Sequence, residues 1–136
     1  MTDDVTQAVD VDAPRERVWQ LLTDPAELPH WWPDAAELEQ RVGGRVVLNF
    51  GPGDVSGEIT QWEPPEAFGF TWKPSNMPGV QLHVSFTVDD LGDGRSRVNV
   101  VHSGFEAAPA AAREAVVEGW AHFLPRLAEV AREENR

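Results

Sequence analysis

Hydrophobic and polar residues alternate near the start of the chain, which is the period-two pattern of a β-strand. Val5, Val9 and Val11 share one parity, whereas Thr6 and Asp10 fall on the other. The pattern predicts a strand over residues 5–11 with one face turned to the core.

Two short helices are predicted after this strand. Pro14 suits a first helical turn because its missing N–H has no partner there. The triplet Thr23-Asp24-Pro25 ends this helix and can open a second one, with the aspartate as cap. We expect the second helix to end over residues 28–33.

The middle of the chain predicts a meander of antiparallel strands, because strand-like runs follow one another with turn signals between them. The turn signals are Gly43-Gly44, Gly51-Pro52-Gly53, Pro64-Pro65, a loop over residues 73–79, and Gly92-Asp93-Gly94. The first of them separates a run that ends at Val42 from a run over residues 46–50. Three later runs each have an apolar face, namely Phe68, Phe70 and Trp72, then Val80, Leu82, Val84, Phe86 and Val88, then Val98, Val100 and His102.

The period changes to that of an amphipathic helix over residues 109–132. Apolar residues recur there at spacings of three and four, at Val116, Trp120, Phe123, Leu127 and Val130. Gly119 weakens a helix by about 1 kcal/mol relative to alanine, and Pro125 removes a backbone hydrogen bond and should bend it. A bent helix could arch over a curved sheet.

The order of elements predicts an α+β fold in a single domain over residues 1–136. A sheet with one apolar face must be covered, and the final helix is long enough to cover it. We therefore expect a curved antiparallel sheet of six or seven strands wrapped around the C-terminal helix. The two surfaces should diverge toward one end, where large rings can leave a cavity.

Charge narrows the range of partners. The chain has 136 residues, 23 acidic and 11 basic side chains, a net charge of −12 and a single lysine, Lys73. Phosphate backbones and anionic lipid surfaces are bound through clustered positive charge, so we predict no nucleic-acid or membrane partner. The first residues also lack the order of a signal peptide, so we expect a soluble, cytoplasmic, acidic protein.

His102 is the most interesting titratable residue, because its parity turns it toward the apolar face. A neutral imidazole there could hydrogen-bond a ligand carbonyl or act as a general base. Alternatively, it is a structural histidine bonded to the backbone or to Ser103. His83 falls on the opposite parity and is interpreted as solvated surface. The chain has no cysteine and no histidine pair at helical metal spacing, so we expect no metal and no cofactor.

Several local patterns resemble those of one family. They are Ala13-Pro14 with Val18-Trp19, Thr23-Asp24-Pro25, Trp31-Trp32, Gly43-Gly44, Gly57 through Glu63-Pro64-Pro65, Phe70-Thr71-Trp72, His102-Ser103-Gly104-Phe105, and Gly119-Trp120 with Leu124 and Leu127. In this order, over nearly the whole chain, they resemble the helix-grip superfamily of START, birch-pollen-allergen and SRPBCC proteins. The nearest branch is the C-terminal domain of the heat-shock protein 90 ATPase activator. Pro125 departs from the family, whose final helix usually runs unbroken.

The resemblance implies the same helix-grip fold, and three functions follow as hypotheses. The leading one is a non-catalytic module that holds a small lipophilic or aromatic molecule between the long helix and the sheet. The alternatives are a cyclase-like or hydratase-like enzyme that uses His102 with a carboxylate, and a chaperone-associated module. The expected ligand-binding residues, which could equally be core, are Trp31, Trp32, Phe70, Trp72, Val84, His102, Trp120, Phe123 and Leu124.

Overall fold

A seven-stranded antiparallel sheet, in the order β1-β7-β6-β5-β4-β3-β2, forms the body of the molecule. The computed structural model describes residues 4–51 and 53–134. The strands are β1 (Val5–Val11), β2 (Ala35–Leu38), β3 (Arg45–Asn49), β4 (Asp54–Glu63), β5 (Ala67–Pro74), β6 (Leu82–Gly92) and β7 (Arg95–Ser103). The helices are α1 (Arg15–Thr23), the 3-10 helices η1 (Leu28–His30) and η2 (Phe105–Ala107), and α2 (Ala110–Glu134). This is the predicted helix-grip architecture.

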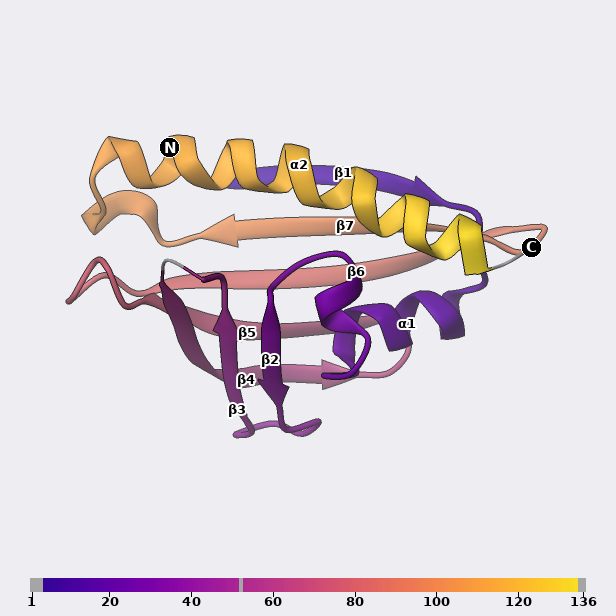
Figure 1. Ribbon diagram of the computed structural model, residues 1–136, viewed down its shortest axis with the longest axis horizontal. Coiled ribbons are helices and arrows are strands. Elements are labelled where there is room, and N and C mark those ends of the chain that lie inside the picture. Colours follow the sequence, from indigo (N-terminus) through magenta and orange to yellow (C-terminus); the bar gives the residue numbers. More distant parts are fainter. Residues whose placement is uncertain (1–3, 52, 135–136) are drawn as a thin grey trace.

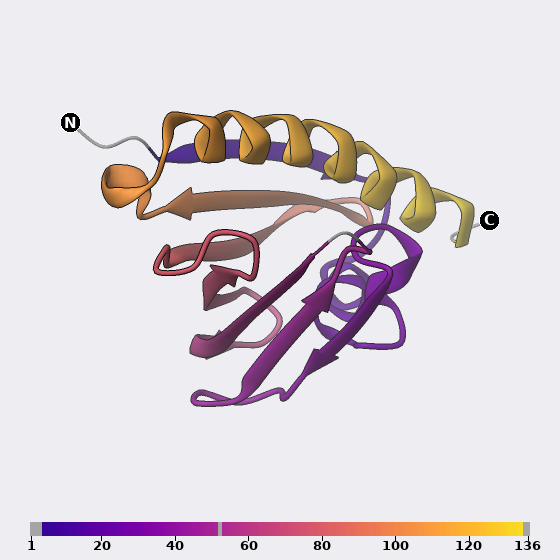
Figure 2. The same cartoon turned by 60° about the vertical axis from the view of Figure 1, so that its left-hand side comes forward.

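The long helix α2 runs alongside β1 over one face of the sheet, and the sheet curves away from it toward β2 (Figures 1 and 2). Gln7 of β1 donates a hydrogen bond of 3.1 Å to the Val117 carbonyl of α2, which fixes the helix to the sheet edge. At one end of the groove α1 packs against α2, β6 and β7 and fills the space. The other end lies under the first half of α2, next to the short turn η2.

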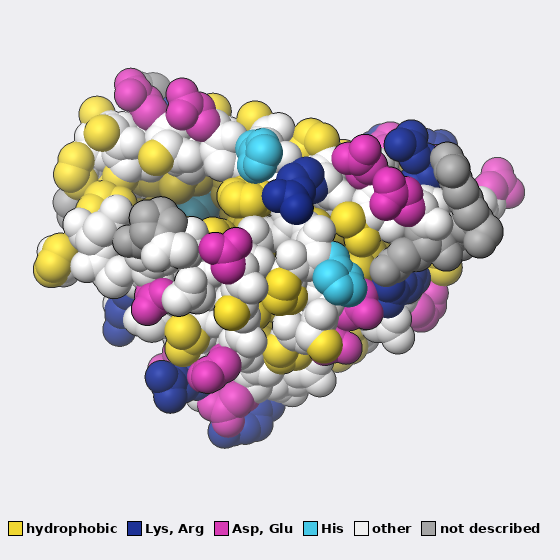
Figure 3. Space-filling model, viewed as in Figure 1, with side chains coloured by type: hydrophobic (Ala, Val, Ile, Leu, Met, Phe, Trp, Pro, Cys, Tyr) yellow, Lys and Arg dark blue, Asp and Glu magenta, His cyan; other side chains and the backbone are white. Residues whose placement is uncertain are grey.

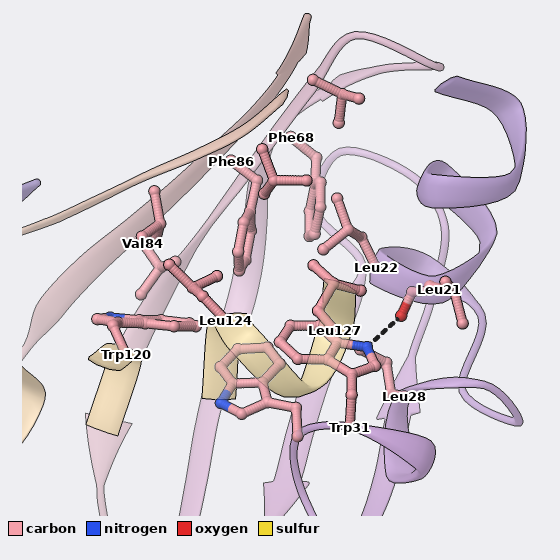
Figure 4. Packing of buried hydrophobic residues seen from close by; sticks show 14 of the residues in the cluster. Leu21, Leu22, Leu28, Trp31, Phe68, Val84, Phe86, Trp120, Leu124 and Leu127 are labelled. Atoms are coloured by element: carbon pink, nitrogen blue, oxygen red, sulfur yellow. Dashed lines mark hydrogen bonds between the residues drawn. The ribbon is translucent and has the colours of Figure 1, made fainter. Parts of the chain in front are cut away.

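The core lies where α1 and the second half of α2 meet the sheet. Figure 4 shows Leu124 of α2 near Val84, and Leu127 near Leu22 and Trp31, all within one buried cluster. The Trp31 indole N–H donates a hydrogen bond of 2.7 Å to the Leu21 carbonyl and is completely buried. Alternation along β6 and β7 turns their apolar residues inward, as the sequence predicts.

The second predicted helix is only a single 3-10 turn. Asp24 does act as a local cap, since its carboxylate accepts a hydrogen bond of 2.9 Å from the Ala26 backbone N–H. Pro29 lies in the first turn, where a missing N–H is tolerated; the Trp32 N–H still donates to the Leu28 carbonyl over 3.1 Å, and Pro33 has no N–H to continue the ladder.

The strand expected to end at Val42 ends earlier, at Leu38. Residues 39–44 form a tight turn in which the Gly44 N–H donates to the Arg41 carbonyl over 2.9 Å, and Val42 is 61% exposed. A Cβ on Gly44 would lie 2.2 Å from the Glu39 carbonyl oxygen, so the turn requires glycine at this position. The predicted Gly51-Pro52-Gly53 turn includes Pro52, which lies outside the described residues.

The helix α2 continues through Pro125, where a bend was expected. Figure 2 shows one continuous helix in a gentle arc that is convex toward solvent. Pro125 is exposed, in a surface hollow that it shares with Val9 and Asp10 of β1, and proline is a usual cause of curvature in a long helix. Within residues 4–51 and 53–134, no helix is long and apolar enough to cross a bilayer.

Candidate functional site

A pocket of about 270 Å³ lies at the end of the groove that α1 does not fill. Figure 3 shows this region as a hollow lined with hydrophobic side chains beneath the first half of α2. The helix contributes Ala112, Ala115, Val116, Gly119, Trp120 and Phe123, and the opposite wall comes from Trp32, Phe50, Gly53, Asp54, Val55, Trp72, Pro74, Asn76, Met77, Leu82 and His102. Helix and sheet diverge here, so the volume follows from the curvature of the fold.

Three tryptophans from three different elements meet in this pocket. Trp32, which follows η1, stacks on Trp72 of β5 with ring centroids 5.8 Å apart. It also contacts Trp120 of α2, with centroids 5.0 Å apart. Trp32 and Trp120 are buried, whereas Trp72 is half-buried at the open side. The wall is therefore aromatic and accessible from one direction.

His102 lies at the inner end of the pocket and has no exposed surface. The Trp120 indole donates a hydrogen bond of 3.1 Å to its Nδ1. An indole nitrogen can only donate, so Nδ1 is an acceptor and the imidazole proton sits on Nε2. Nε2 is buried and has no hydrogen-bond partner among the described residues. Burial, with a smaller contribution from His83, lowers the His102 pKa to about 3, which keeps the ring neutral.

Hydrogen bonds between the start of β4 and the residue after β5 hold one edge of the pocket. The Asp54 backbone N–H donates to the Ser75 hydroxyl over 3.0 Å, and the Ser75 N–H donates to the Asp54 carbonyl over 2.8 Å. The Asp54 carboxylate accepts a further bond of 2.7 Å from the Asn49 amide. These contacts tie the start of β4 to the end of β5 at one edge of the pocket.

Gly119 keeps the helix side of the pocket open. A Cβ built on this residue meets no atom within 4 Å. Its backbone is helical, so no unusual dihedral requires glycine there. The missing side chain leaves space between Val116, Trp120 and the opposite wall.

The structure separates the nine predicted ligand-binding residues into two groups. Those that line the pocket are Trp32, Trp72, His102, Trp120 and Phe123. Those that pack in the core beside it are Trp31, Phe70, Val84 and Leu124. Phe50, Met77 and Gly119 are among the lining residues that the sequence did not predict. Phe50 shares the parity of Val46 and Leu48, which was a usable signal, whereas nothing in the pattern indicated Met77, which lies in a loop.

Neither ring nitrogen of His102 contacts a carboxylate in the described part of the chain, although the enzyme hypothesis needs such a partner. The residues of the two described segments also contain no group of three or more potential metal ligands. His83 lies on the other face of the sheet, half-buried, with its Nε2 2.7 Å from the Thr60 hydroxyl. Because His83 is half-buried, it is less solvated than the sequence predicts, and this burial lowers its pKa.

A family model described as Activator of Hsp90 ATPase homolog 1-like protein matches residues 12–132. No curated protein matches the chain.

Solved structures share the whole fold at low identity. The protein MLL2253 from Mesorhizobium loti is 22% identical, with a TM-score of 0.86 over 96% of this chain and 97% of that one. An Aha1 dimer from Colwellia psychrerythraea is 21% identical, with a TM-score of 0.81 over 94% and 95% of the two chains. DynU16, from the dynemicin biosynthetic locus, is 25% identical, with a TM-score of 0.82 over 95% of this chain. The chain spans about half of DynU16, covering 47% of it.

Proposed function

The chain belongs to the Activator of Hsp90 ATPase homolog 1-like family, and from this premise we propose that it binds a small lipophilic ring compound in the pocket beneath α2. The observation that carries the proposal is the meeting of Trp32, Trp72 and Trp120 around open space. Ligand pockets are mostly apolar, with a few placed polar groups. This pocket has that composition.

The volume supports a small ligand. An engineered apolar cavity of about 150 Å³ binds benzene, so a pocket of about 270 Å³ has room for one or two rings. Gly119 supports the same conclusion, because a larger residue would fill the space and alanine would make the helix more stable. Glycine at this position therefore weakens the helix and widens the pocket.

The test is binding of tetralin, an uncharged two-ring hydrocarbon, followed by thermal unfolding and tryptophan fluorescence. A ligand that binds only the folded state raises Tm with its concentration. We expect tetralin to raise the Tm of the wild-type chain. It should not change the Tm of Gly119→Leu, because the leucine side chain occupies the pocket. Ala121→Leu, an exposed position on the same helix, is the matched control and should respond like wild type. Absence of any shift in the wild-type chain refutes the proposal.

Binding to a chaperone ATPase is the second candidate, supported by the family description. Such an interface favours an exposed apolar patch. Among the described residues, the exposed large hydrophobics are Val42 and Leu91, which lie at the ends of different strand pairs. The ATPase rate of Hsp90 in the presence of this chain tests the idea. Stimulation that persists in Gly119→Leu would favour this function over ligand binding.

A further inference from the structure

We propose that the ligand of this pocket is an uncharged ring compound that accepts a hydrogen bond from Nε2–H of His102 through a carbonyl-type oxygen. The inference rests on the proposed function and adds the chemical class of the ligand. Three features of the described residues support it: an unpaired hydrogen-bond donor, the charge around this donor, and the aromatic wall of the pocket.

The unpaired donor follows from the contact between Trp120 and His102. The indole occupies Nδ1 as a donor, so the proton of the neutral imidazole is on Nε2. Nε2 is buried without a partner in residues 4–51 and 53–134. Buried polar groups are nearly always hydrogen-bonded, and a lone buried N–H is destabilising. A ligand oxygen would satisfy this donor.

The charge around the pocket selects against an anionic ligand. Burial lowers the pKa of His102 to about 3, so the imidazole offers a donor but no positive charge at neutral pH. Asp54 is the acidic residue among those that line the pocket, with its carboxylate bonded to Asn49, and the whole chain has a net charge of −12. Burying a carboxylate beside a neutral ring is unfavourable. A ketone, amide, ester or quinone oxygen accepts the same bond without that cost.

The aromatic wall selects a ring. Trp32, Trp72 and Trp120 surround the space next to His102, and flat apolar molecules pack well against such faces. The Trp72 ring is the aromatic neighbour nearest to His102, with centroids 4.9 Å apart, and it is only half-buried. Because Nε2 itself has no exposed surface, we expect Trp72 to change rotamer as the oxygen arrives.

A matched pair of probes isolates the hydrogen bond. Tetralin and 1-tetralone have the same two-ring frame and differ by one carbonyl group. The Kd of each is measured for the wild-type chain and for His102→Phe, which keeps a ring but removes the donor. The preference for tetralone over tetralin should be roughly fivefold to tenfold greater in wild type than in the variant. Comparing the two ratios cancels the different hydration of the probes.

The outcomes distinguish the two proposals. If neither probe binds the wild-type chain, the proposed function fails. If both bind and His102→Phe changes their affinities equally, ligand binding stands and the inference about the carbonyl is overturned. Tighter binding of anionic 1-naphthoate than of tetralone would also overturn it.

A second measurement on the wild-type chain needs no variant, which matters if His102→Phe does not fold. In ¹⁵N NMR, the Nε2–H signal of His102 should move on addition of 1-tetralone and much less with tetralin. Equal responses to both probes, or a proton found on Nδ1, would contradict the inference.

Discussion

The Trp120 indole N–H donates a hydrogen bond of 3.1 Å to Nδ1 of His102, and the two side chains join the middle of α2 to β7. His102 pairs with Val5 on one side and Val84 on the other, so it lies inside the sheet and away from its edges. The contact is possible only while Nδ1 is unprotonated. The position of α2 over the pocket is therefore coupled to the neutral form of this histidine.

Stability should fall as the pH falls below the unfolded pKa of His102. The folded pKa is about 3 and the ordinary value is 6.5, so between these values the unfolded chain binds a proton that the folded chain does not. Above pH 6.5, His102 adds no pH dependence to the free energy of unfolding. Below pH 6.5, this free energy should fall by about 1.4 kcal/mol for each pH unit. Denaturant unfolding from pH 7.5 to 4.5 measures the slope.

His102→Phe is the control for this pH dependence. Burial also lowers the folded pKa of His83 from its ordinary value of 6.5, so this histidine too makes stability fall in the same pH range. Asp10 and Glu39 have folded pKa values lowered by hydrogen bonds with Arg97 and with the Arg45 backbone, and their contributions are lost only below their ordinary values of 3.8 and 4.5. These groups remain in the variant, so the difference between the two slopes belongs to His102. Identical slopes in the two proteins would mean that burial does not depress the pKa of this histidine.

Gly119→Ala should stabilise the fold. The added methyl group meets no atom within 4 Å, and alanine is the better helix former by about 1 kcal/mol. We expect Tm to rise by roughly 3–5 °C. Gly57→Ala is the contrasting variant, because its Cβ would lie 1.8 Å from the Thr71 carbonyl oxygen on the neighbouring strand. That change should lower Tm strongly, and a loss of stability in Gly119→Ala would argue against open space at 119.

The sequence predicts the sheet and the long helix because burial there repeats with a regular period. The alternation along β6 and β7 determines which side chains face inward, including His102. Turn signals at Gly92 and Gly94 also coincide with the real turn. Within a regular strand or helix, the repeat determines which side chains face inward, so the local pattern is sufficient to predict their burial.

The pocket could be predicted only in part, because it depends on what fills each end of the groove. Phe70 and Trp72 share a face of β5, yet Phe70 is in the core and Trp72 lines the pocket. Which part of the groove is filled depends on how distant elements pack together, and no periodicity in the chain encodes it. Trp31 and Trp32 lie in irregular backbone directly after η1, where strand alternation does not apply. The pattern therefore could not predict which of the two lines the pocket and which packs in the core.

Trp31 and Trp72 should differ in what their substitution changes. Trp31→Phe removes the buried hydrogen bond to the Leu21 carbonyl and leaves a cavity, so it should cost about 2–3 kcal/mol of unfolding free energy. It should leave the affinity for tetralin nearly unchanged. Trp72→Ala removes a half-buried ring at the pocket mouth, so it should weaken tetralin binding more than it lowers stability. If Trp31→Phe weakened tetralin binding and Trp72→Ala mainly lowered stability, the core and the pocket would not be separate.

Pro125→Ala tests whether the proline inside the continuous helix α2 has a structural role. Proline inside a helix lacks the N–H that would bond to the Ala121 carbonyl, and it is less favourable than alanine by about 3 kcal/mol in a helix interior. Pro125 is exposed, so replacing it removes little packing. We expect the variant to gain about 1–3 kcal/mol of unfolding free energy in urea while tetralin affinity is preserved. If stability falls instead, the curvature that proline imposes is needed for α2 to follow the sheet.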